Sequence, residues 1–214
     1  MKEISGTGSD SESTWKQVEC GCGIRLHDAE ASRLKYSGIP CVAQKQTFST
    51  FTSITGTESV LEAAKSIIVN PTVTLVLLYG GRGNGKSHLA HASGMEAIKQ
   101  GHPTRFLRCS QLLREFKGAK SQGDGGQQAY EAIFMEYLTI PYLIIDEFSW
   151  RTEADIVMLE DIVCEREAEY RMTLLTSNHD KSDIDDAFPR VYSRLLAKTS
   201  ILALNDAPDY RVEK

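Results

Sequence analysis

Residues 79–94 read YGGRGNGKSHLAHASG, in which four glycines precede a Lys-Ser pair. The run TVTLVLLY (Thr72–Tyr79) leads into the glycines, and its unbroken apolar, β-branched pattern predicts a strand buried on both faces. A helix is predicted from Lys86 to about Lys99, because a glycine and a proline follow shortly after. The stretch therefore connects a buried strand to a helix through a glycine-rich turn.

The spacing Gly80-x4-Gly85-Lys86-Ser87 matches a phosphate-binding loop. Glycines let backbone N–H groups turn toward phosphate oxygens, and the positive end of the next helix faces the same anion. We expect Lys86 to neutralise the β- and γ-phosphates and the Ser87 hydroxyl to bind Mg²⁺. The alternative is a glycine-rich turn that merely precedes Lys-Ser. The predicted ligand is ATP, bound by Gly80, Gly81, Arg82, Gly83, Asn84, Gly85, Lys86, Ser87 and His88.

Two carboxylates end the run YLIIDE (Tyr142–Glu147), which predicts a third buried strand. This places both acids at the carboxyl edge of a parallel sheet, beside the phosphates. We expect Asp146 to hold Mg²⁺, directly or through water, and Glu147 to polarise the water that attacks the γ-phosphorus. The alternative is a pair of solvated acids at a strand end. Pairing with a phosphate loop favours the first interpretation, and the glutamate favours hydrolysis over transfer to another substrate.

Two later segments carry polar groups that suit phosphoryl transfer. The predicted strand TLLTSN (Thr173–Asn178) ends in an amide that could touch the γ-phosphate or orient the attacking water, although asparagine after a strand also forms turns. In RVYSRLL (Arg190–Leu196), Arg190 and Arg194 lie one helical turn apart, and guanidinium groups stabilise the charge of the transferring phosphate. The alternative is a solvated helix face. The predicted catalytic residues are Lys86, Glu147, Asn178 and Arg194.

Strands alternate with helices along the rest of the chain. Further strands are predicted at 104–109 and 200–204, and helices at 59–69, 111–120, 127–138, 152–170 and 190–197. This alternation predicts a three-layer α/β domain with a five-stranded parallel sheet. We assign residues 45–214 to this domain and residues 1–44 to an N-terminal extension. The extension is predicted to be disordered over 1–14, where Gly, Ser, Thr and acidic residues dominate.

Composition narrows the class of protein. The 214 residues carry a formal net charge of -5, so any DNA binding needs a local basic patch. No apolar run is long enough to span a bilayer, and residues 1–14 lack the apolar core of a signal peptide. The five cysteines are an odd number and widely spaced, which indicates reduced thiols. We therefore expect a cytoplasmic protein that does not bind membranes.

A zinc site in the extension is the alternative use of three of these cysteines. Cys20-Gly-Cys22 is followed by His27 and Cys41, whereas zinc sites use four ligands, usually in pairs two to four residues apart. Because this pattern is incomplete, we expect that the extension does not bind zinc. If zinc were bound, Cys20, Cys22 and Cys41 would be the ligands.

The phosphate loop, the Asp-Glu strand, the Asn-ended strand and the Ser-Arg-Leu helix, in this order, resemble the AAA+ ATPases. The closer likeness is to the DnaC-type helicase loaders and the IstB transposition ATPases. It rests also on RLKYSGIPCVAQKQTFSTF (Arg33–Phe51), on YSRLL, and on LNDAPDYR (Leu204–Arg211). The resemblance covers roughly residues 33–211 and implies an AAA+ core with no or minimal C-terminal helical lid.

The resemblance also implies how such a protein works. Family members use ATP to assemble copies of themselves, often on single-stranded DNA, and an arginine acts on the neighbouring subunit's nucleotide. That role falls to Arg194, with Arg190 as a second candidate. Helices after the second strand line the DNA path in relatives, where this chain offers Arg114, Lys117 and Lys120.

Three hypotheses follow for the function. The first is an ATP-hydrolysing helicase loader in DNA replication, whose partner is a replicative helicase. The second is an IstB-like helper with the same chemistry and a transposase as its partner. The third is a module that binds ATP without hydrolysing it, so that the nucleotide only switches DNA or protein binding.

Overall fold

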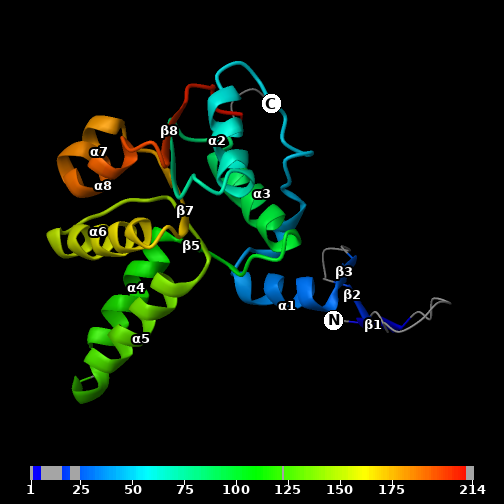
Figure 1. Cartoon of the computed structure of the whole chain (residues 1–214), viewed down its shortest axis with the longest axis horizontal. Helices are drawn as coiled ribbons and strands as arrows, with labels where there is room; N and C mark the ends of the chain where they lie inside the picture. The colour runs from blue at the N-terminus through cyan, green and yellow to red at the C-terminus, as the bar shows by residue number, and fades with distance from the viewer. Residues whose placement is uncertain (1, 6–15, 20–24, 122, 211–214) are drawn as a thin grey trace.

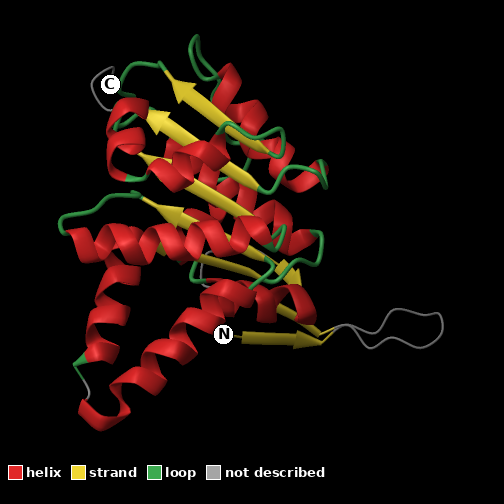
Figure 2. Ribbon diagram, turned by 60° about the vertical axis from the view of Figure 1, so that its left-hand side comes forward, coloured by secondary structure: helices red, strands yellow, loops and turns green. Residues whose placement is uncertain are grey.

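A computed structural model describes residues 2–5, 16–19, 25–121 and 123–210. Its centre is a five-stranded sheet in the order β5-β6-β7-β4-β8, and every pairing is parallel. The strands are β4 (Leu75–Gly80), β5 (Thr104–Arg108), β6 (Tyr142–Asp146), β7 (Met172–Ser177) and β8 (Ser200–Asn205). The predicted sheet is therefore confirmed, and Figure 2 shows its strands running in one direction between helices.

Helices cover both faces of the sheet, which makes three layers (Figure 1). They are α1 (Asp28–Ser37), α2 (Glu58–Val69), α3 (Lys86–Lys99), α4 (Cys109–Lys120), α5 (Gly126–Thr139), α6 (Glu153–Ala168), α7 (Lys181–Ala187) and α8 (Pro189–Leu195), with short 3-10 helices at Cys41–Lys45 and Gly123–Gly125. None of the helices in the described ranges is long and apolar enough to cross a membrane.

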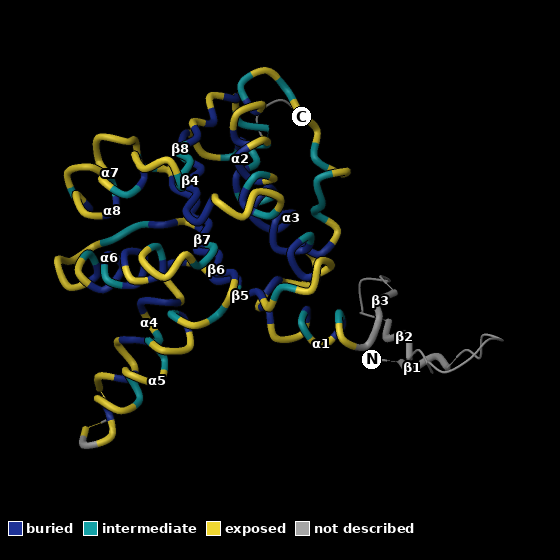
Figure 3. Tube along the Cα trace, viewed as in Figure 1, coloured by how far each residue is buried: buried dark blue, intermediate teal, exposed yellow. Residues whose placement is uncertain are grey.

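Alternate residues of the central strand belong to two separate apolar cores. Val76 and Leu78 pack in one cluster with α1, α2 and α3, whereas Leu75 and Leu77 pack in another with α4 to α8. Side chains of a strand point to opposite faces in turn, so a run without polar residues fits a sheet covered on both sides. Figure 3 shows the strands as the most deeply buried part of the molecule.

The N-terminal region contains a small antiparallel sheet of β1 (Lys2–Ser5), β2 (Lys16–Glu19) and β3 (Arg25–His27). The prediction of disorder over residues 1–14 is thus wrong for Lys2–Ser5, because these residues pair with Lys16–Glu19. Residues 6–14 lie outside the described residues. The boundary between extension and domain near residue 44 stays a prediction.

The hairpin of α4 and α5 projects from the body, as Figures 1 and 2 show. Its base is fixed by Arg166 of α6, whose side chain is completely buried. The guanidinium donates to the carbonyl oxygens of Tyr137 and Ile140 at the end of α5, and to that of Met172 at the start of β7. Burial lowers the pKa of Arg166 to about 9, and the negative end of the α5 dipole favours the charged form. Arg166 therefore connects the hairpin to the strand that leads into the candidate site.

Candidate nucleotide-binding site

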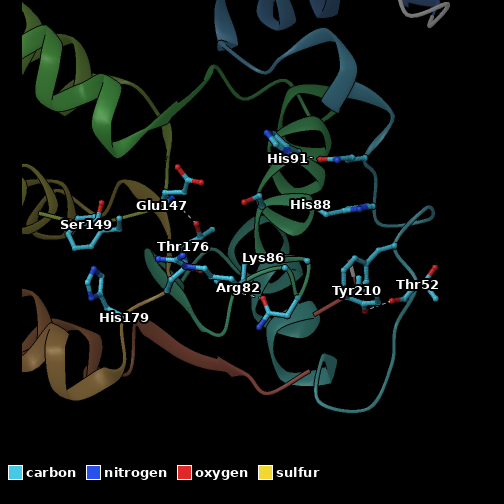
Figure 4. A pocket seen from close by; sticks show the side chains of 18 of the residues that line it. Thr52, Arg82, Lys86, His88, His91, Glu147, Ser149, Thr176, His179 and Tyr210 are labelled. Carbon is cyan, nitrogen blue, oxygen red and sulfur yellow. Dashed lines mark hydrogen bonds between the residues drawn. The ribbon is translucent and has the colours of Figure 1, made fainter. Parts of the chain in front are cut away.

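A cavity of about 1100 Å³ lies at the carboxyl edge of the sheet. Its walls come from the phosphate loop, the ends of β6 and β7, the segment before α2, and the segment after β8 (Figure 4). Of the predicted residues, it brings together Arg82, Gly83, Asn84, Gly85, Lys86, Ser87, His88, Glu147 and Asn178.

The glycine-rich turn has the backbone that the sequence predicts. Gly85 caps the N-terminus of α3 in the left-handed region, with φ 92°. A Cβ on Gly85 would come within 2.8 Å of the Phe51 ring, and one on Gly80 would overlap the Asn205 carbonyl. Both the dihedral angle and the close packing therefore require glycine.

The ammonium group of Lys86 lies inside the loop. Its side chain is 5% exposed and donates to the carbonyl oxygen of Gly80 at 2.9 Å, to that of Gly81, and to Asn84 Oδ1 at 3.0 Å. These three contacts are with neutral oxygens of the loop itself, so they hold the charge of Lys86 inside the loop. The arrangement suits a phosphate group.

The two predicted magnesium ligands lie next to each other. Ser87 Oγ donates to Asp146 Oδ1 at 3.0 Å, and Thr176 Oγ1 donates to the same oxygen at 2.5 Å. Asp146 is 3% exposed at the end of β6. A hydroxyl beside a carboxylate is the hard oxygen donor set that Mg²⁺ prefers, so these residues fit the ion. Thr176 is missing from the predicted site; its only signal in the sequence is a hydroxyl within the run LLTSN.

Glu147 adopts a backbone conformation that is rare for a residue with a side chain. Its φ is 57°, and the Thr176 hydroxyl and carbonyl hold the strand end in place by accepting from the N–H groups of Glu147 (3.0 Å) and Phe148 (2.6 Å). The side chain is exposed and lines the cavity. Left-handed backbone at a non-glycine residue costs free energy and is concentrated at functional sites. The conformation is consistent with the predicted water-activating role.

Asn178 follows β7 and lines the cavity, as Glu147 does. Its neighbour Ser177 donates from Oγ to the Phe148 carbonyl at 3.0 Å, which joins the ends of β6 and β7. His179 also lines the cavity and packs against the Trp150 ring, with 4.4 Å between centroids. The sequence analysis identified neither aromatic residue.

The opposite end of the cavity is built by residues that are distant in sequence. Phe51, Thr52 and Tyr210 line it, and Tyr210 donates from its hydroxyl to the Thr52 carbonyl at 2.8 Å. Its backbone N–H donates to the Gly83 carbonyl at 3.1 Å. In the sequence, these residues were marked only by the similarity of Arg33–Phe51 and Leu204–Arg211 to the family.

Two histidines of α3 face the segment before α2. His88 Nε2 donates to the Thr47 carbonyl at 2.9 Å, so its ring is bound to protein rather than directed at the loop glycines. His91 hydrogen-bonds Gln46 Oε1 through Nδ1 at 2.7 Å, and burial lowers its pKa to about 4. His91 is therefore neutral at physiological pH. Because the ring of His88 is bound to Thr47, the predicted contact of His88 with the nucleotide falls to its backbone N–H group.

The predicted arginine and DNA-binding residues lie away from the cavity. On α8, Arg194 pairs with Glu167 at 3.3 Å and Arg190 pairs with Asp161 at 3.2 Å, both on α6. On α4, Lys117 pairs with Asp155 at 2.8 Å, and Lys120 lies 4.7 Å from the Tyr130 ring centroid. Arg114 is exposed.

The possible zinc ligands are only partly described. Cys20 and Cys22 lie outside the described residues, and Cys41 is exposed. Within the described ranges, the structure contains no cluster of three or more His, Cys, Asp or Glu that could hold a metal ion. The expectation about zinc stays a prediction.

The sequence is similar to insertion-sequence ATP-binding proteins and to replication proteins. The family described as IstB-like ATP binding protein matches residues 32–195. An insertion-sequence protein of Mycobacterium tuberculosis, named as ATP-binding, is 30% identical over 146 residues, or 65% of this chain and 56% of that protein. The replicative helicase loader DnaC of Buchnera aphidicola (subspecies Schizaphis graminum) is 28% identical over 73% of this chain and 65% of the relative. The chain spans about half to two thirds of the curated relatives' length.

Solved structures share the fold. The replication initiator DnaA bound to AMPPCP and single-stranded DNA has a TM-score of 0.67 at 20% identity, over 77% of this chain and 50% of that one. The DnaC helicase loader has a TM-score of 0.64 at 17% identity, over 77% of this chain and 99% of that one. These similarities confirm the predicted fold class, a three-layer phosphate-loop core with a five-stranded parallel sheet.

Proposed function

The chain belongs to the family of IstB-like ATP-binding proteins, and on that basis we propose that it hydrolyses ATP between copies of itself assembled on single-stranded DNA. The observation that carries the proposal is the Ser87–Asp146 hydrogen bond at the end of the phosphate loop, with Glu147 lining the same cavity. A binding module without hydrolysis has no need of a strained glutamate beside a magnesium site.

The residues divide the chemistry between them. The loop N–H groups and Lys86 bind the phosphates, and Ser87 with Asp146 would hold Mg²⁺, which would offset charge on the phosphate oxygens. Glu147 accepts a proton from the attacking water as the water oxygen bonds to the γ-phosphorus. The bond to the ADP oxygen then breaks, and Asn178 orients the water or the γ-phosphate. Thr176 is a positioning residue, because it bonds both Asp146 and the Glu147 backbone.

The nucleoside is assigned to the other end of the cavity. Phe51 and Tyr210 both approach Gly85, and rings of this kind offer flat apolar surface to a purine. The triphosphate then runs from Gly85 toward Glu147, which matches the order of groups along the cavity.

Arg194 is proposed to act on the nucleotide of a neighbouring copy. It is part-exposed (32%) and is bound by Glu167 and the Arg190 carbonyl, contacts that it must leave to reach a neighbour. We expect Arg194→Ala to keep its ATP affinity and to lose at least about tenfold in turnover, measured as phosphate release with single-stranded DNA present. Arg190→Ala tests the second candidate for this role, because it removes a similar ion pair from the same helix; a larger loss of turnover in Arg190→Ala than in Arg194→Ala would assign the role to Arg190.

Mixing Arg194→Ala with Glu147→Gln tests the same proposal directly. At a mixed interface, one copy supplies Glu147 and the other supplies Arg194, so part of the turnover should return. Turnover per chain should also rise with protein concentration. Equal turnover at every concentration, with no recovery on mixing, would show that each chain hydrolyses ATP alone.

Single-stranded DNA is proposed to follow the projecting α4–α5 hairpin, because a few cations repeated along an assembly can track one strand. We expect AMPPCP to strengthen binding to a labelled oligonucleotide, and Arg114, Lys117 and Lys120 changed together to Ala to weaken it at least about tenfold and flatten its salt dependence. Fluorescence anisotropy at several salt concentrations measures this. The control removes three cations from the opposite face of the sheet: Lys45, Lys65 and Lys99.

The contacts of the three basic residues single out Arg114 for a separate DNA-binding test. Lys117 is bound to Asp155 in the first turn of α6, whereas Arg114 is exposed. Arg114→Ala alone should therefore weaken DNA binding without lowering the melting temperature. An unchanged affinity in both the single and the triple variant would rule out the hairpin as the DNA path.

Two kinds of partner protein are proposed, a replicative helicase and a transposase, and different relatives support each of them. DnaC loaders match 73% of the chain and favour a replicative helicase, whereas the family match and the insertion-sequence relatives favour a transposase. The Glu147→Gln variant, which is expected to bind ATP and hydrolyse it very slowly, can be used with ATP as bait in extracts of the cells that produce the protein. Nucleotide-dependent capture of a helicase supports loading, and capture of a transposase supports transposition.

A further inference from the structure

His179 is a cavity-lining histidine to which the proposed hydrolysis assigns no role. It follows Asn178 after the end of β7. Figure 4 shows its ring toward the end of the cavity where Glu147 and Thr176 lie, opposite Tyr210. The proposed path of the triphosphate ends there with the γ-phosphate. The ring of His179 therefore borders the proposed position of that group.

Three contacts hold His179 in place. Its backbone N–H donates to Ser177 Oγ at 3.1 Å, and its ring packs on Trp150, with 4.4 Å between the centroids and 33° between the planes. Nδ1 lies 3.6 Å from Oδ2 of Asp183, in the first turn of α7. Trp150 is held in turn by the Phe188 ring, at 4.7 Å between centroids. The imidazole is thus oriented in advance, while 39% of the side chain stays exposed and can be reached by a ligand.

The contact with Asp183 leaves the other ring nitrogen for a ligand. Within the residues that the structure describes, Nε2 of His179 has no hydrogen-bond partner. An imidazole whose Nδ1 faces a carboxylate is favoured in its doubly protonated form, and the cation then donates from Nε2. The two other histidines of the cavity are committed differently, because the ring of His88 is bound to protein and His91 is neutral.

We propose that His179 donates a hydrogen bond from Nε2 to the γ-phosphate and so makes the site distinguish ATP from ADP. ADP has no γ-phosphate, so this contact, which is charge-assisted on both sides, forms with ATP alone. The inference rests on the proposed function, namely that ATP binds in this cavity with its γ-phosphate near Glu147.

Isothermal titration of the full chain with AMPPCP and with ADP, both in Mg²⁺, tests the contact. His179→Phe keeps a flat ring on Trp150 but removes both nitrogens. It should weaken AMPPCP binding at least about tenfold and ADP binding by less than about twofold. His179→Gln keeps a neutral N–H donor and should weaken AMPPCP binding only about threefold. His102→Phe is the control, because it makes the same change before β5, at the opposite edge of the sheet, and should alter neither affinity.

Trp150 provides a second readout, because it lies against the ring that is proposed to become charged. A cation against an indole ring interacts with its π-system, and this contact should change the emission of Trp150. In a Trp15→Phe background, Trp150 is the one tryptophan left in the chain. AMPPCP should then change the tryptophan emission more than ADP does, and the difference should vanish when His179→Phe is added.

Two results in His179→Phe would overturn the inference and leave the proposed function intact. Equal losses for AMPPCP and ADP would show that the histidine only supports the shape of the cavity. Wild-type affinity for both nucleotides would show that His179 does not contact the γ-phosphate. A wild-type chain that binds neither nucleotide would instead refute the proposed function, and the inference with it.

Discussion

Replacing Lys86 by alanine is expected to abolish measurable ATP binding, a loss of about 100-fold or more in affinity. The ammonium group is almost fully buried inside the phosphate loop, where it donates to neutral oxygens of Gly80 and Asn84. Bound phosphates would replace them with charge-assisted hydrogen bonds, each contributing about 1.5–3 kcal/mol. Two such bonds account for the expected loss.

Isothermal titration with AMPPCP measures the effect, and Lys99→Ala is the matched control. Lys99 ends the same helix, but it is half-exposed and forms an ion pair with Glu96 at 3.9 Å. Alanine at Lys99 should leave the affinity unchanged. The melting temperature of each variant reports whether the loop still folds. A folded Lys86→Ala chain that binds within about tenfold of the wild type would show that the phosphates lie elsewhere.

The fold could be predicted because the strongest patterns lie in buried strands. The centres of the two runs, LVLL (75–78) and LII (143–145), contain no polar residue, and a sheet covered on both faces buries such runs. Elements with weak sequence patterns were predicted wrongly or missed. Helix α7 was not predicted: it has seven residues, and its Asp180–Asp183 capping box has no apolar stripe beside it. Helix α4 begins at Cys109, where a strand end was predicted, because the chain turns directly from β5 into the helix.

The candidate site was predictable only where its residues are consecutive. The phosphate loop and the Asp-Glu pair could be recognised from the spacing of their residues. Ser87 and Asp146 come together because parallel strands end at one edge of the sheet. Tyr210 and Asn205 reach the loop from more than 120 residues away, through backbone and amide contacts that leave no periodic pattern. Their positions depend on how β8 pairs with β4.

Glu147→Gln is expected to bind ATP within about twofold of the wild type and to hydrolyse it at least about 100-fold more slowly. Glutamine keeps the size and the backbone contacts of Glu147 but cannot accept the proton of the attacking water, and a positioned base contributes about 10²–10⁴-fold. Single-turnover phosphate release measures the chemical step. Glu153→Gln is the control, because it removes an exposed carboxylate from the first turn of α6. Wild-type turnover in Glu147→Gln would exclude Glu147 as the base.

A second substitution at the same position separates catalysis from folding. The φ of 57° at Glu147 is strained for any side chain but not for glycine, and relief of such strain contributes about 1 kcal/mol. Glu147→Gly should therefore raise the melting temperature by about 2–4 °C while it removes turnover. If glycine instead lowers the melting temperature, the strain is not stored at this residue. A higher melting temperature in Glu147→Gly would mean that the strained backbone at this residue lowers stability in the wild type. We infer that the strain serves function, because the left-handed backbone directs the carboxylate into the cavity.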